Sequence, residues 1–190
     1  MSNHNILRLA GIASILAAIG MVGVTFSMDQ ETYMPNSPLF SVFSWGSIIL
    51  GIVLSVGLYM FYRQEAATLA LVAAAVSILG VLIYGAAALA WQPGNPMIFI
   101  GDMATYVVGV ALFSWLALKT KKVSRFLAYV GFVSALSGII EYALAFTMGE
   151  KAAAAMTFYF IYTLLTLVWL VWTGISLLRA KPQAVAAKAA

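Results

Sequence analysis

The sequence predicts an all-α membrane protein, a bundle of six transmembrane helices with the N and C termini in the cytoplasm. Of its 190 residues, 64% are hydrophobic and 8% are charged, and the mean hydropathy is +1.01. These values leave too few polar groups to cover the surface of a soluble domain, so lipid must be the solvent. The apolar runs are continuous and do not alternate between two faces, which favours helices over a β-barrel.

Six apolar runs follow one another, each longer than the ~20 residues that a helix needs to cross ~30 Å of hydrocarbon. The expected helices cover residues 6–28, 39–62, 66–91, 97–118, 123–148 and 152–178. Residues 1–180 are expected to form a single transmembrane domain. The remaining residues, 181–190, are poor in large apolar side chains and are expected to be a disordered tail.

The limits of several runs are marked by characteristic residues. The first run has an alternative interpretation as a signal peptide, but it exceeds the roughly 7–15 apolar residues of such a signal and lacks a clear cleavage site. The polar triplet 63–65 closes the second run. Asn95 is placed to cap the fourth helix, with Pro96 in its first turn, and Gly149 ends the fifth helix.

Lysine and arginine predict the orientation, because cytoplasmic loops of membrane proteins carry an excess of these residues. Nine of the ten fall on one side of the predicted bundle, and only Lys151 falls on the other. The side with nine is therefore expected to be cytoplasmic, and its most basic segment is the turn 119–125. The acidic residues, apart from Glu65, fall toward the outer side.

The basic turn 119–125 joins two helices that carry Asp102 and Glu141. The midpoint between the two acids falls in this turn, so an antiparallel hairpin places their carboxylates level with each other. Small residues at four-residue spacing from Gly101 to Gly109 predict close contact with a neighbouring helix beside Asp102. No proline lies inside a run, which counts against the broken helices of many transporters.

Asp102 and Glu141 form the main candidate site, because an ionisable residue at membrane depth is costly and is often functional. Two like charges in a low dielectric disfavour double ionisation, so one acid would keep a proton or both would share a cation. Thr105, Tyr106 and Tyr142 lie close enough in sequence to contribute hydrogen bonds. The hypothesis is a ligand site for a small cation, proton or amine; the alternatives are a structural or hydrated pair and a contact with a partner.

The last run carries a polar stripe. At 100° per residue, its hydroxyl and indole side chains share one arc of about 120°. These residues are Tyr159, Tyr162, Thr163, Thr166, Trp169 and Thr173. One hypothesis is that the stripe lines a cavity, and the other is that it bonds to the backbone and to neighbouring helices inside the bundle.

Several activities lack the residues that they require. The chain has no cysteine and a single histidine, His4, which excludes cysteine-based zinc and iron–sulfur sites, bis-histidine haem and Ser-His hydrolysis. No lysine lies in the middle of a run. We expect no enzyme activity and no cofactor, and the position of the basic residues at the ends of runs argues against nucleic-acid binding. Methionine is abundant in the outer half and suits Cu(I), but it is also an ordinary filler of apolar gaps, so the metal remains unknown.

The segment 111–138 consists of an apolar helix, a basic turn and a second helix that begins with Arg125 and small residues. In this it resembles a broad class of uncharacterised bacterial multi-pass membrane proteins, and the run 6–28 resembles their opening helix. The resemblance implies a bacterial inner (plasma) membrane location, and the class has no settled activity to carry over.

Two functions remain open. In the first, the protein binds or passes a small cation, proton or amine from the outer side, as in transport. In the second, it is a non-catalytic accessory subunit that docks onto a larger membrane complex through its small-residue ridges. The lipid bilayer surrounds it in both cases, and the candidate partner is another membrane protein or a second copy. A lipid-modifying enzyme is a third hypothesis, with no residues to support it.

Overall fold

The computed structural model describes residues 3–28, 34–35, 37–89 and 95–180. Its helices are α1 (Asn3–Phe26), α2 (Leu39–Leu89), α3 (Pro96–Asp102), the π-helix η1 (Met103–Gly109), α4 (Val110–Thr120), α5 (Arg125–Met148) and α6 (Ala153–Leu178). The described residues contain no strand, only an isolated bridge between Met28 and Pro35. The expected all-α class is therefore confirmed for this part of the chain. The predicted tail, 181–190, lies outside it.

The helices are long and apolar enough to cross a membrane. Among the described residues, five segments qualify: Asn3–Phe26, Leu39–Ala88, Pro96–Thr120, Arg125–Met148 and Ala153–Leu178. Large apolar side chains such as Ile19, Leu136 and Leu164 point outward and are more than half exposed. Because only lipid favours such a surface, the chain is a multi-pass membrane protein.

The second and third predicted runs are not separated by a break at the polar triplet 63–65. The structure joins them into α2, which departs from helical torsion angles only at Ala66 (φ −151°, ψ 60°). The triplet therefore lies on the last helical turn before the bend. No loop separates the two runs, because one non-helical residue is enough to redirect the chain. The other predicted limits are close: α1, α5 and α6 begin and end within three residues of them.

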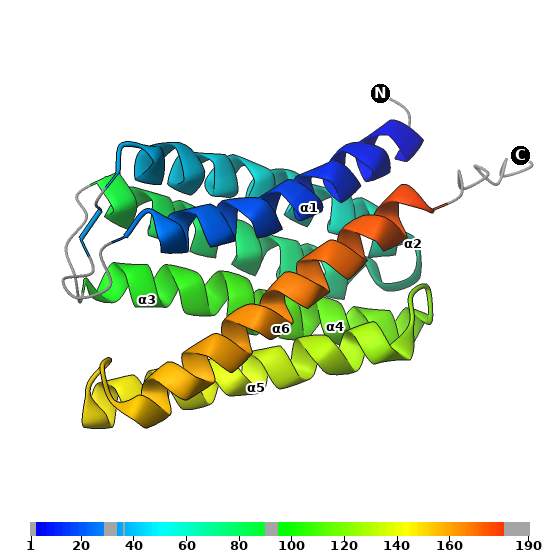
Figure 1. The fold of residues 1–190 in the computed structure, drawn as a ribbon. Helices are drawn as coiled ribbons and strands as arrows, with labels where there is room; N and C mark the ends of the chain where they lie inside the picture. Colours follow the sequence, from blue (N-terminus) through cyan, green and yellow to red (C-terminus); the bar gives the residue numbers. More distant parts are fainter. Residues whose placement is uncertain (1–2, 29–33, 36, 90–94, 181–190) are drawn as a thin grey trace, which may run out of the picture.

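The elements form a closed ring in which each packs on its neighbours and α6 returns to α1 (Figure 1). α1 runs along the first half of α2. The two halves of α2 contact each other, since a Cβ on Gly85 would meet Ile48 and one on Gly51 would meet Val81. The second half of α2 then packs on α3 and η1, α4 packs on α5, and α5 packs on α6.

The small-residue ridge 101–109 is a region of close backbone approach to α2. A Cβ on Gly101 would lie 2.8 Å from the carbonyl oxygen of Gly80, and one on Gly80 would collide with Thr105. A Cβ placed on Gly109 would likewise collide with the side chain of Ser77 on α2. The predicted close contact is therefore confirmed, and glycine is required because the neighbouring atoms belong partly to the backbone.

The fourth predicted helix, 97–118, is not a regular α-helix throughout. It starts as expected, with Asn95 Oδ1 accepting a hydrogen bond from the Met97 amide (3.0 Å). Directly after Asp102 the chain continues as the π-helix η1. The Thr105 hydroxyl donates to the Gly101 carbonyl oxygen (2.9 Å), a side-chain bond that competes with the regular helical pattern. Such π segments are rare and often mark functional sites.

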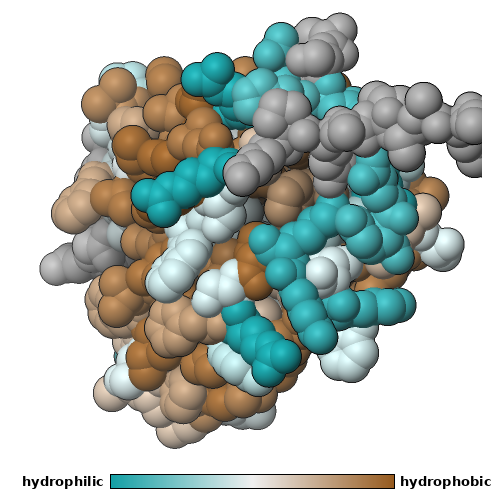
Figure 2. Space-filling view, turned by 90° about the vertical axis from the view of Figure 1, so that its right-hand side faces the viewer, coloured by the Kyte–Doolittle hydropathy of each residue, from teal (hydrophilic) through white to brown (hydrophobic). Residues whose placement is uncertain are grey.

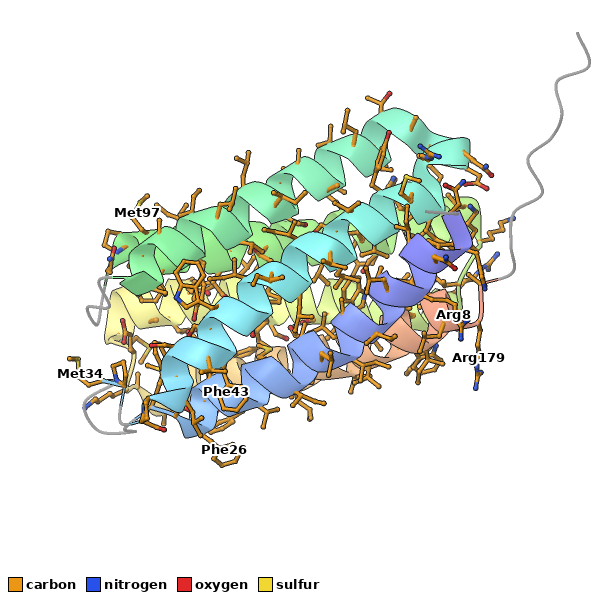
Figure 3. The ribbon with its side chains drawn as sticks, turned by 90° about the horizontal axis from the view of Figure 1, so that it is seen from above. Arg8, Phe26, Met34, Phe43, Met97 and Arg179 are labelled. Carbon is orange, nitrogen blue, oxygen red and sulfur yellow. The ribbon has the colours of Figure 1, made fainter. Side chains whose placement is uncertain are left out.

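Basic side chains gather at one end of the bundle, which we call the basic end. It comprises the start of α1, the bend of α2, the α4–α5 turn and the end of α6 (Figure 1). Figure 3 labels Arg8 and Arg179 at this end and Met34 and Met97 at the opposite end. Seen end-on, the basic end shows hydrophilic side chains gathered over one part of an otherwise apolar molecule (Figure 2).

The α4–α5 turn is held to the bend of α2 by a lysine. Lys121 caps the end of α4 with a φ of 55°, in the left-handed region. The next residue, Lys122, forms an ion pair with Glu65 (2.8 Å) and donates a hydrogen bond to the carbonyl oxygen of Phe61. The basic turn 119–125 and the triplet 63–65 therefore lie side by side at the basic end.

Candidate functional site

A cavity of about 270 Å³ lies toward the end of the bundle opposite the basic end. The end of α1, both halves of α2, the α3–η1 segment, α5 and α6 all contribute to its wall. The described lining residues are Met21, Val24, Thr25, Met28, Ser47, Ile48, Val81, Tyr84, Asn95, Ile98, Phe99, Gly101, Asp102, Thr105, Tyr106, Glu141, Tyr142, Glu150, Met156, Tyr159, Phe160 and Tyr162. A mostly apolar wall with a few polar groups is typical of a small-molecule site.

Asp102 lies on this wall at the junction of α3 and η1. Two tyrosine hydroxyls from two other helices donate to the same carboxylate oxygen, Oδ2: that of Tyr142 on α5 and that of Tyr162 on α6 (2.8 Å). No described residue donates a hydrogen bond to the other oxygen, Oδ1. Asp102 therefore ties three helices together through one oxygen, and its other oxygen has no donor in the described part of the chain.

Glu141 lies on the same wall and is only 9% exposed. Its carboxylate is near enough to that of Asp102 for the two to interact electrostatically. Within the described part of the chain, Glu141 has no hydrogen bond or ion pair. A carboxylate this buried normally has a hydrogen-bond or ion-pair partner. Because Glu141 has none among the described residues, its carboxylate can accept a hydrogen bond from a ligand in the cavity.

The residues predicted to support the two acids also reach the cavity, but in different roles. Tyr142 bonds directly to Asp102, whereas Tyr106 contributes to the wall. Thr105 lines the cavity but donates to backbone, to the carbonyl oxygens of Gly101 (2.9 Å) and Ser77 (3.4 Å). The expected hydrogen bond from Thr105 to a carboxylate is absent among the described residues, because its position inside η1 turns its hydroxyl to the helix backbone.

The structure divides the polar stripe of α6. Its two members closest to the start of α6, Tyr159 and Tyr162, line the cavity. The remaining members, Thr163, Thr166, Trp169 and Thr173, do not line it. The Thr166 hydroxyl lies 2.8 Å from that of Ser134 on α5, inside a close α5–α6 contact. Beyond Tyr162 the stripe contributes instead to packing, and the buried Thr173 hydroxyl has no partner in the described chain.

Sequence reasoning missed part of the aromatic wall. Tyr84, Phe99 and Phe160 all line the cavity, and Phe99 meets the Tyr142 ring edge-on at a centroid distance of 5.7 Å. The only sequence signal was the spacing of Tyr84 four residues after Gly80, which places it beside the ridge 101–109. Three outer-half methionines also line the cavity: Met21, Met28 and Met156.

No family model, curated protein or solved structure matches this chain. The chemistry of the site therefore rests on its own residues. Three acids line the cavity, Asp102, Glu141 and Glu150, and the described lining residues include no lysine, arginine or histidine. Acidic groups on low-dielectric walls create a negative potential that attracts cations and repels anions.

Proposed function

We propose that this protein binds a small cation or amine at Asp102 and Glu141, as a step in passing it into or across the membrane. The observation that carries the proposal is Glu141, a 9%-exposed carboxylate with no hydrogen bond in the described chain, facing a cavity shared with Asp102. A positive ligand would supply the missing partner. A proton is the smallest such ligand and would satisfy the same pair by bridging or neutralising it.

The proposed topology has six crossings, with α2 crossing twice about Ala66 and both termini in the cytoplasm. Supporting it are the contacts between the two halves of α2 and the excess of lysine and arginine at the basic end. The cavity then faces the outer side. A bacterial inner-membrane location is part of the proposal and rests on the resemblance of the segment 111–138 to multi-pass proteins of that membrane.

Single-cysteine labelling tests the topology cleanly, because the chain has no cysteine of its own. A membrane-impermeant maleimide should label Lys151→Cys in intact cells. It should label Gln64→Cys and Lys121→Cys only after the membrane is opened. Labelling of Gln64→Cys in intact cells, with Lys121→Cys protected, would overturn the double crossing of α2.

Ligand-dependent melting tests the function. The purified protein in detergent is heated in a panel of monovalent and divalent cations and amines and across a pH series. A ligand that binds only the folded state stabilises it by about 2.7 kcal/mol at one hundred times its Kd, so the melting temperature should rise with ligand concentration. The rise should vanish in Asp102→Asn and shrink in Glu141→Gln.

Glu65→Gln is the matched control, because it removes one carboxylate at the basic end and should leave the response intact. A flat response of the wild type to every cation, amine and pH would refute the proposal. So would a response that persists in the Asp102→Asn, Glu141→Gln double variant. Either result would favour the accessory-subunit hypothesis, which co-purification of a membrane partner would then support.

A further inference from the structure

The cavity wall also restricts which cation fits. Seven of the described lining residues are aromatic: Tyr84, Phe99, Tyr106, Tyr142, Tyr159, Phe160 and Tyr162. They come from four separate parts of the ring, the second half of α2, the α3–η1 segment, α5 and α6. Of the other fifteen described lining residues, seven have aliphatic or thioether side chains, seven are polar or acidic, and one is Gly101. The surface that meets a ligand is thus chiefly apolar, with the acids as its charged members.

Metal ions match this wall poorly. Ca²⁺ takes six to eight oxygen ligands, and Mg²⁺ requires an octahedral shell with retained waters. Among the described residues there is no group of three or more acidic, histidine or cysteine side chains that could hold a metal ion. A hydrated metal would also place its water shell against the aromatic faces, so the rings would make no direct contact with the ion.

A primary ammonium has three donors that each need an acceptor. Oδ1 of Asp102 and the carboxylates of Glu141 and Glu150 have no donor among the described residues, while Oδ2 of Asp102 already accepts from Tyr142 and Tyr162. The acids therefore offer enough acceptors for a primary ammonium, and it is the aromatic part of the wall that distinguishes the classes of amine. A tertiary ammonium has one N–H donor and a quaternary ammonium has none, so these ions need few or no hydrogen-bond acceptors. They need negative charge nearby and apolar surface around their alkyl groups, and both are present here.

From this combination we infer that the ligand is an organic ammonium ion with apolar substituents, a quaternary or tertiary amine small enough for a cavity of about 270 Å³. The inference rests on the proposed cation-binding function and names its ligand class. Aromatic faces attract such ions through the ring quadrupole, and quaternary ammonium groups are the best-known ligands of aromatic cages. Asp102 and Glu141 balance the charge, and the tyrosine and phenylalanine rings contact the alkyl groups.

The test compares five probes by melting temperature and by isothermal titration calorimetry: tetramethylammonium, choline, methylammonium, sodium and 3,3-dimethylbutan-1-ol. The last is the uncharged carbon counterpart of choline and separates charge from shape. Tetramethylammonium and choline should act at the lowest concentrations, and the neutral alcohol should have no effect. A response to sodium or methylammonium through Asp102, without one to the alkylated ions, would overturn the ligand class and leave the proposed function standing. No response to any cation would overturn both.

Variants at Tyr159 test the aromatic contribution. This residue lines the cavity and, unlike Tyr142 and Tyr162, makes no hydrogen bond to Asp102. Tyr159→Phe keeps the ring and should retain affinity for tetramethylammonium, whereas Tyr159→Leu should weaken it by about 2- to 30-fold. Equal affinity in the two variants, or equal binding of choline and its neutral counterpart, would refute the inference. The probe comparison on the wild type decides the question even if Tyr159→Leu does not fold.

Discussion

The two ends of the same helices are packed in opposite ways. The basic end is a continuous apolar core that includes Leu58, Phe61, Phe113, Leu116, Leu127, Leu170 and Leu177. The void found there is only about 10 Å³. At the opposite end the buried cluster shrinks to Val107, Ala135, Tyr142 and Tyr162, beside the cavity of about 270 Å³.

The contrast comes from what the inward-facing side chains require. Leucine and phenylalanine interdigitate until no space remains, since dispersion contacts are lost wherever a gap persists. Asp102 and Glu141 require polar partners, and the two tyrosines that donate to Asp102 line the cavity. One end of the bundle therefore provides the stability and the other can provide a ligand site.

The largest expected loss of stability comes from a substitution in the packed core of the basic end. Leu116 is fully buried, and Leu116→Ala should lower the free energy of unfolding by about 2–5 kcal/mol, mainly through lost packing because lipid is itself apolar. Leu136→Ala is the control, since Leu136 is 57% exposed on the lipid side. Thermal unfolding in detergent measures both. Equal losses in the two variants would show that the basic end is not the stabilising core.

An intermediate effect is expected where the backbone is close beside the cavity. Gly101→Ala places a Cβ 2.8 Å from the carbonyl oxygen of Gly80 and should cost about 1–3 kcal/mol. Gly46→Ala is the matched control, because no atom lies within 4 Å of its Cβ, and it should be neutral or stabilising by up to roughly 1 kcal/mol. The same melts compare them. A neutral Gly101→Ala would mean that α2 and α3 do not approach as described.

The smallest effect concerns the ion pair at the basic end. The Glu65 side chain is 39% exposed, so Glu65→Gln should cost no more than about 1 kcal/mol, and high salt should produce the same loss in the wild type. Glu150→Gln, at the opposite end, is the control and should not change the salt dependence of the melting temperature. A salt dependence that persists unchanged in Glu65→Gln would show that the pair does not tether the α4–α5 turn.

Much of the candidate site could be predicted because it depends on helix periodicity and on symmetry about one turn. Asp102 and Glu141 lie almost equally far from the turn 119–125, and the structure brings them to one cavity. The partners of Asp102 were harder to find. Tyr162 lies sixty residues away on another helix, and no local pattern distinguishes it from the other polar residues of α6.

The sequence by itself determined the properties that follow from composition and local chemistry. These are the all-α membrane class, most helix limits, the Asn95 cap and the close contact along the ridge 101–109, because hydropathy, capping and small-residue spacing act over a few residues. Only the tertiary structure decided that the second and third runs join without a loop through the bend at Ala66, where η1 interrupts the helix, and which polar residues of α6 meet the cavity. Those features depend on how neighbouring helices share one interior, which the sequence of a single segment does not determine.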